Sequence, residues 1–116
     1  MALETRPKYT CLIFLAKPMI IRPLTDLETI EGDHAKMSAC IEGIPKPEMS
    51  WFKDNMRIIE DDSLSIEVKD NCQTLSIPDV VEEDCGIYAV VAKNLVGEVR
   101  SEAELSVVGN DQSCNK

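Results

Sequence analysis

Short stretches in which apolar and polar residues alternate run along most of the chain, and turn-forming residues interrupt them about every ten positions. Alternation with a period of two is typical of strands that bury one face. The stretches expected to be extended are 17–23, 24–31, 34–43, 50–59 with a turn at 54–55, 64–69, 73–77, 87–94 and 99–108. No long segment keeps a helical period. The pattern therefore predicts an all-β fold in which short antiparallel strands form a two-sheet sandwich.

The stretch 34–43 alternates most clearly, but the alternation alone does not decide which of its faces is buried. One face would carry Ala35, Met37, Ala39 and Ile41. The other would carry His34, Lys36, Ser38 and Cys40.

The length of 116 residues fits a single domain. We expect an N-terminal extension or linker at 1–16, the folded domain at 17–108 and a disordered tail at 109–116. The apolar run Tyr9–Ala16 follows basic residues, but it is short for a signal peptide and too short to span a bilayer.

The formal net charge of −9 narrows the classes of partner. Phosphate backbones and anionic membrane surfaces repel such a chain, so neither nucleic acid nor a membrane is expected as a partner. The acidity suits a solvated surface or a basic protein partner.

Candidate chemistry is sparse. The single histidine and the five scattered cysteines make no zinc-ligand spacing, and no catalytic motif is present. The acidic pairs Asp61–Asp62 and Glu82–Glu83 fall in expected turns and lack the spacing of a calcium loop. We therefore expect no enzyme activity, no cofactor and no metal.

Five motifs occur in an order and spacing that resemble an immunoglobulin domain of the intermediate (I-set) type. They are EGD at 31–33, Cys40 with the following EGIPKP and Trp51, TLSI at 74–77, DCGIYAVVAKN at 84–94 and the hairpin NLVGE at 94–98. The resemblance covers about residues 17–108 and is closest to domains of giant muscle proteins such as titin, twitchin and obscurin.

The resemblance implies a role for each residue in the motifs. The structural core would contain Cys40, Trp51, Leu75, Tyr88 and Val90, and tight turns would lie at Gly32, Gly86 and Gly97. In the family the position assigned to Cys40 points inward. His34, Lys36 and Ser38 would then share its inward side.

Val90 stands where the family has its second cysteine, so the usual inter-sheet bridge cannot form. Cys72 and Cys85 flank a strand of about 17 Å and cannot pair, because bridged Cα atoms lie within about 7 Å. We therefore expect no intramolecular disulfide, an oxidisable Cys85 in a turn, and a reducing compartment.

By the same resemblance the chain would be one bead of a tandem array in a giant sarcomeric or cytoskeletal protein. It would be cytoplasmic, bear tension and dock filament proteins or neighbouring immunoglobulin and fibronectin-type domains, and it would be a monomer in isolation. Residues 27–31 would pair in parallel with 100–107. Contacts with partners are expected at Lys46, Glu48, Lys93, Leu95 and Val96. The alternatives are an extracellular domain of an adhesion molecule or receptor, and a docking or regulatory domain beside a kinase.

Overall fold

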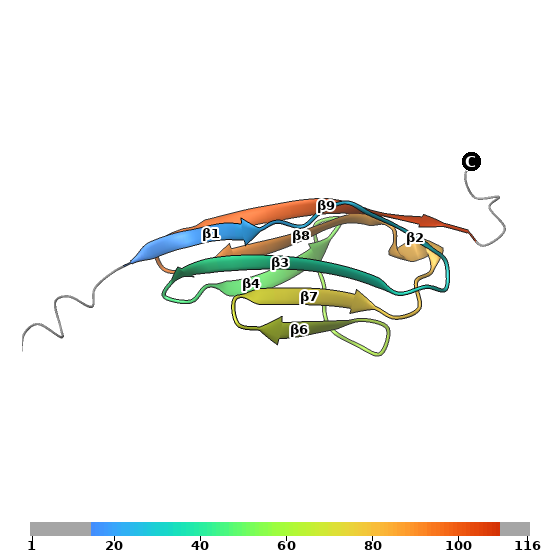
Figure 1. Ribbon diagram of the computed structural model, residues 1–116, viewed down its shortest axis with the longest axis horizontal. Coiled ribbons are helices and arrows are strands. Elements are labelled where there is room, and N and C mark those ends of the chain that lie inside the picture. The colour runs from blue at the N-terminus through green and yellow to red at the C-terminus, as the bar shows by residue number, and fades with distance from the viewer. Residues whose placement is uncertain (1–14, 110–116) are drawn as a thin grey trace, which may run out of the picture.

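The computed structural model describes residues 15–109 of the chain and consists almost entirely of strands (Figure 1). The expected extension 1–16 and tail 109–116 fall almost wholly outside the described residues. The elements are β1 (Ala16–Arg22), β2 (Leu27–Ile30), β3 (Ala35–Ile44), β4 (Glu48–Lys53), β5 (Met56–Arg57), β6 (Ser65–Lys69), β7 (Cys72–Ile77), the 3₁₀ turn η2 (Glu82–Asp84), β8 (Gly86–Lys93) and β9 (Glu98–Val108). No helix among these residues is long and apolar enough to cross a membrane.

The strands form the two packed sheets that the alternation predicts. One sheet has the order β1-β3-β7-β6, and the other has the order β2-β9-β8-β4-β5. Neighbouring strands are antiparallel except for β2 and β9, which are parallel. The chain enters β1 at one end of the sandwich and leaves β9 at the other (Figure 1). The predicted sandwich is thus confirmed.

The inward face of β3 is the opposite of the one expected. Ala35, Met37, Ala39 and Ile41 are buried, whereas Lys36 and Ser38 are exposed and Cys40 is only half-buried. A shift of one residue exchanges every side chain of a strand between its two faces. The assignment of Cys40 to the core was therefore wrong, and its neighbour Ala39 takes the inward position.

The remaining assigned core residues are buried between the sheets. Trp51, Leu75, Tyr88 and Val90 are each at most 2% exposed. Ala39 and Val90 both have no exposed surface. Ala39 and Val90 both belong to the hydrophobic core between the sheets, and neither can form a disulfide across it.

The expectation of no intramolecular disulfide is wrong as well. Cys40 of β3 and Cys72 of β7 are directly opposed in the antiparallel ladder and are joined by a disulfide, with Cα atoms 3.9 Å apart. The bond links two neighbouring strands of one sheet on its outer face and does not cross the core. Cysteine spacing does not predict this pair, because the β3–β7 register brings together residues that are 32 apart in the sequence.

The expected parallel pairing near the C-terminus is confirmed. Residues Leu27–Ile30 pair with Leu105–Val108, and the backbone N–H of Glu31 continues the contact with a 2.8 Å hydrogen bond to the carbonyl of Val108. The paired part of β9 is its last four residues, a shorter segment than expected. This pairing joins the N-terminal part of the domain to β9, the strand at whose end the chain leaves the sandwich.

Candidate partner-binding site at the N-terminal pole

Four of the five expected partner contacts gather around one hollow. The β3–β4 loop and the β8–β9 turn meet at the pole where β1 begins, which we call the N-terminal pole. There they line an open hollow of about 370 Å³. Its lining comprises Pro45, Lys46, Glu48, Lys93, Asn94 and Leu95. Val96 is on the same turn but does not line the hollow.

Asn94 organises this pole. Its side-chain nitrogen donates to the carbonyls of Ala16 and Pro45, each over 2.9 Å. Its side-chain oxygen accepts from the backbone N–H groups of Val96 and Gly97 at 2.9 and 3.1 Å. One amide therefore connects the entry to β1, the β3–β4 loop and the β8–β9 turn. Asparagine is common in turns because its side chain bonds backbone groups nearby, and this signal could have identified Asn94.

The chemistry of the hollow suits contact with another protein. Leu95 is 75% exposed at the tip of the turn. Lys46 and Lys93 contribute two cations beside it, and Glu48 is directly opposed to Lys93 in the β4–β8 ladder. An exposed apolar side chain with charged side chains around it resembles the arrangement of a protein interface, in which an apolar centre is surrounded by a polar rim.

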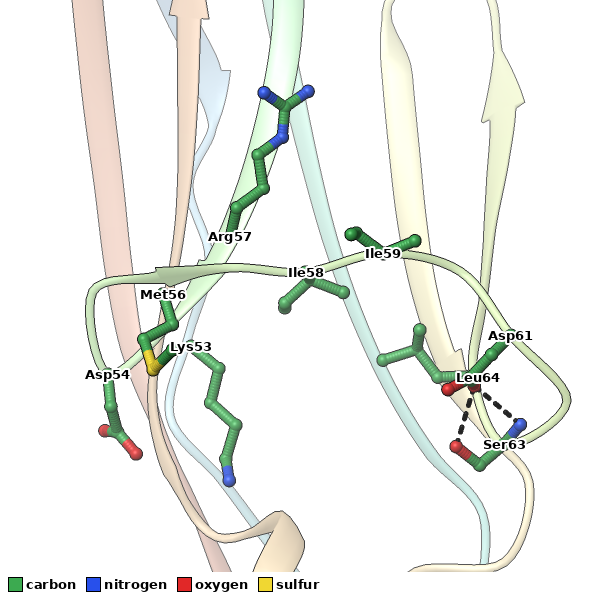
Figure 2. Close-up of a pocket in the computed structure, with 9 residues that line it drawn as sticks. All are labelled: Lys53, Asp54, Met56, Arg57, Ile58, Ile59, Asp61, Ser63 and Leu64. Carbon is green, nitrogen blue, oxygen red and sulfur yellow. Dashed lines mark hydrogen bonds between the residues drawn. The ribbon is translucent and has the colours of Figure 1, made fainter.

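A second hollow, of about 340 Å³, was missed in the sequence (Figure 2). Figure 2 shows Ile58 and Leu64 pointing into the space between the hairpin turn at 54–55 and the turn at 61–64. Met56 and Ile59, which also line it, are 73% and 78% exposed. The stretch MRII at 56–59, in which three of the four residues are apolar, directly follows a turn and could have indicated this hollow.

The turn glycines fall at bends of the chain. Gly32 and Gly86 have φ angles of +93° and +154°. At Gly86 an added Cβ would lie 2.7 Å from Oδ2 of Asp54, whose other oxygen accepts the backbone N–H of Ile87 at 3.0 Å. Gly97 closes the β8–β9 turn, where its carbonyl accepts the N–H of Asn94 at 2.9 Å.

The acidic turns cap backbone groups. Asp61 accepts the hydroxyl and the N–H of Ser63, both at 2.8 Å, and these two bonds lower the pKa of Asp61 below its ordinary value of 3.8. Asp84 accepts the N–H of Val81 at 2.8 Å. Within residues 15–109 no three acidic, histidine or cysteine side chains are grouped so that they could hold a metal ion. Cys85 is exposed and free.

Comparisons with known proteins agree with this architecture. Residues 18–107 match the family Immunoglobulin I-set domain. Cardiac-type myosin-binding protein C of Rattus norvegicus is 37% identical over 101 residues, which are 87% of this chain and 8% of that protein. Vascular endothelial growth factor receptor 3 of Danio rerio is 41% identical over 84 residues, which are 72% of this chain and 6% of the receptor.

Solved structures show the same fold. A chimeric titin Z1Z2 functionalized with a KLER peptide from decorin superposes with a TM-score of 0.81 at 32% identity, over 84% of this chain and all of that one. The chain spans less than a tenth of the length of the curated relatives it matches. The chain belongs to the immunoglobulin I-set family.

Proposed function

We propose that the chain is one non-enzymatic bead of a tandem array in a giant sarcomeric or cytoskeletal protein. In this role residues 17–108 bear tension and dock protein partners. Family membership and the similarity to cardiac-type myosin-binding protein C and to titin support the proposal. The small share of each relative that the chain matches fits a module repeated or combined within a longer protein.

The observation that best supports the proposal is the parallel pairing of β2 with β9. The chain enters the sandwich at one pole and leaves it at the other (Figure 1). Tension applied to the two termini therefore acts along the strands. The four residue pairs between Leu27–Ile30 and Leu105–Val108 would then be loaded in shear, and their hydrogen bonds would resist together. A set of hydrogen bonds that is sheared together suits a domain that must stay folded under tension.

The N-terminal pole is the proposed docking surface. Leu95 and the surrounding lysines offer an apolar and cationic contact, while the chain as a whole has a net charge of −9 and favours basic partners elsewhere on its surface. The proposed partners are filament proteins or neighbouring domains of the same array. The parent protein would be cytoplasmic. In isolation the domain would be a monomer.

Cosedimentation with purified myosin filaments and with F-actin tests the docking role. Leu95→Ala with Val96→Ala should reduce sedimentation with at least one filament. Met56→Ala with Ile59→Ala, which removes two exposed apolar side chains at the second hollow, is the control and should have little effect. The proposal that the N-terminal pole docks these filaments is overturned if the wild-type domain sediments with neither filament, or if both double variants behave alike.

A second function, an extracellular domain of a receptor, is favoured by one observation, the Cys40–Cys72 disulfide. Disulfides persist in oxidising compartments and are rare in the cytosol. The similarity to the zebrafish receptor is consistent with this reading. Rapid alkylation of thiols in intact cells, followed by mass spectrometry, separates the two functions: a fully oxidised pair in every molecule favours the extracellular domain.

A further inference from the structure

Two tetrapeptides of the chain carry the pattern of acids that acidophilic serine/threonine kinases select. Such kinases use basic side chains to bind carboxylates that follow the hydroxyl residue, above all the carboxylate three positions after it. TDLE at 25–28 and SEAE at 101–104 both place an acid one and three positions after the hydroxyl residue. The pattern therefore identifies Thr25 and Ser101 as candidates for phosphorylation and does not separate them.

The structure separates the two candidates by their accessibility. Ser101 is 7% exposed in β9 and is opposed to Val90 of β8, and its hydroxyl oxygen accepts the backbone N–H of Leu24 at 3.0 Å. A kinase could reach this hydroxyl only if the β8–β9 pairing opened. Thr25 is exposed and lies in the link 23–26, which joins β1 to β2 and belongs to neither strand. Of the two candidates, only Thr25 is therefore accessible to an enzyme in the folded domain.

We propose that Thr25 is a phosphorylation site for an acidophilic serine/threonine kinase. Asp26 and Glu28, the two acids that such a kinase would bind, are both exposed. β2 is the edge strand of its sheet and pairs with β9 on one side, and within residues 15–109 no strand pairs with its other side. The hydroxyl and both recognition carboxylates are thus accessible without unfolding of the domain.

The transfer needs the kinase and ATP with Mg²⁺ as the phosphoryl donor. The Oγ1 atom of Thr25 attacks the γ-phosphorus, and the bond from that phosphorus to the oxygen that bridges it to the β-phosphate breaks. ADP leaves with the bonding electron pair, and the hydroxyl proton passes to the catalytic aspartate of the kinase. The product is a phosphothreonine, which carries a charge of about −1.5 to −2 at pH 7.

The link that carries Thr25 is held to β9 by one hydrogen bond on either side of this residue. The backbone N–H of Leu24 donates to the hydroxyl of Ser101 at 3.0 Å. The carboxylate of Asp26 accepts the backbone N–H of Glu104 at 2.8 Å. A phosphate on Thr25 would therefore be attached between the two contacts that hold the link in place.

The charges around the link favour its release from β9 after phosphorylation. Asp26, Glu102 and Glu104 together line an open hollow of about 260 Å³. The nearest cations offer little compensation, because Arg100 is paired with Glu102 at 2.7 Å and Arg22 belongs to a strand of the other sheet. The added phosphate is repelled by the carboxylates, which weakens the contact of Asp26 with β9. Neither the site nor this effect depends on the tension-bearing role.

Incubation of the full chain with casein kinase II and ATP, followed by intact-mass measurement and peptide mapping, tests the site. One phosphate should be added, at Thr25. Thr25→Ala should abolish the modification, and Thr25→Ser should retain it. Glu28→Gln should slow it about tenfold or more, because a charged contact with the kinase is lost. Glu31→Gln, which removes an equal charge outside the tetrapeptide, is the matched control and should leave the rate nearly unchanged.

A synthetic peptide of residues 98–107 provides the control for accessibility. The kinase should phosphorylate Ser101 in this peptide and leave Ser101 unmodified in the folded domain. The proposal is overturned if the kinase modifies the peptide but adds no phosphate to Thr25 of the folded domain. It is also overturned if Glu28→Gln and Glu31→Gln are slowed equally.

Urea unfolding of the phosphorylated and unmodified chains tests the effect on the link. The phosphorylated chain should unfold at a lower urea concentration at low ionic strength, and the difference should shrink as salt screens the repulsion. The phosphorylated Thr25→Ser variant should show the same shift relative to its unmodified form. Equal midpoints for the modified and unmodified chains at low ionic strength would overturn the predicted weakening of the link.

Discussion

The indole N–H of Trp51 donates a 2.8 Å hydrogen bond to the side-chain oxygen of Gln73. Trp51 is in β4 of one sheet, and Gln73 is in β7 of the other, so the bond joins the two sheets. A buried indole ring fills much of a core that has only five aromatic residues to draw on, and its single polar group is satisfied. The packing and the polar contact together fix the relative position of the sheets.

Loss of this partner should destabilise the domain measurably. Gln73→Met keeps a side chain of similar length but leaves the indole N–H without its acceptor, and it should cost about 1–3 kcal/mol of unfolding free energy. Trp51→Ala should cost about 3–5 kcal/mol because it also opens a cavity. Glu67→Ala, on the exposed side of the adjacent strand, should stay within about 0.5 kcal/mol. Urea unfolding followed by far-ultraviolet circular dichroism measures all three, and a silent Trp51→Ala would contradict the packing.

Tyr88 should make the domain sensitive to alkaline pH. Its hydroxyl donates a 2.5 Å hydrogen bond to the carbonyl of Asp84, and burial, followed by the carboxylates of Asp84 and Asp54, raises the pKa of Tyr88 above its ordinary value of 10.0. The unfolded chain therefore loses this proton first, and the unfolding free energy falls as the pH rises above the unfolded pKa.

Urea titrations from about pH 8 to about pH 11 should show this fall, and Tyr88→Phe should make it shallower. At neutral pH the same substitution should cost about 0.5–1.5 kcal/mol for the lost hydrogen bond. Identical pH profiles for the two proteins would contradict the assignment.

Gly86 and Asp54 should be energetically coupled. Gly86→Ala forces a side chain onto a positive φ and pushes its Cβ against the Asp54 carboxylate, so it should cost about 1–3 kcal/mol. In an Asp54→Ala background the clash is absent and only the backbone part of the cost remains. A double-mutant cycle should therefore give a coupling of about 0.5 kcal/mol or more. If the costs of the two single substitutions add fully, the Asp54 carboxylate and a side chain at position 86 do not compete for space.

The sequence predicted the fold because its evidence was redundant. Alternation, turn residues and five ordered motifs all indicated the same sandwich, and Trp51 and Tyr88 lie where the motifs placed them. The prediction of which face of β3 is buried was wrong because it rested on one residue, Cys40, and not on the other residues of the strand. Ala35, Met37, Ala39 and Ile41 are uniformly apolar, whereas His34, Lys36 and Ser38 are polar, so the composition of the two faces favoured the correct choice.

The candidate site was partly predictable for a different reason. Exposed charged and apolar residues in two loops identified Lys46, Lys93 and Leu95, but their grouping depends on the tertiary contacts of Asn94 with Ala16 and Pro45. Likewise the disulfide depends on a strand register that no local pattern encodes. Long-range pairing, and not residue type, was the missing information in both cases.

The disulfide should shorten the extension of the unfolded domain. With Cys40 and Cys72 joined, the intervening chain cannot be stretched, because the 32-residue separation is bypassed by one covalent bond. At about 3.3–3.6 Å per residue, the oxidised domain should extend roughly 110 Å less than the reduced domain. Cys40→Ser with Cys72→Ser should match the reduced wild type. Equal extensions in the two redox states, with the pair verified as oxidised beforehand, would contradict the crosslink.

The shear patch between β2 and β9 is the central claim, and single-molecule pulling from the two termini tests it most directly. Thr29→Pro or Ile30→Pro deletes a backbone donor within the four paired residues of β2, whereas Asp62→Pro places proline in an exposed turn. We predict that at least one of the first two variants lowers the unfolding force sharply, with a smaller loss of equilibrium stability, while Asp62→Pro retains the wild-type force. An unchanged force in both β2 variants would contradict the account of this domain as a tension-bearing bead.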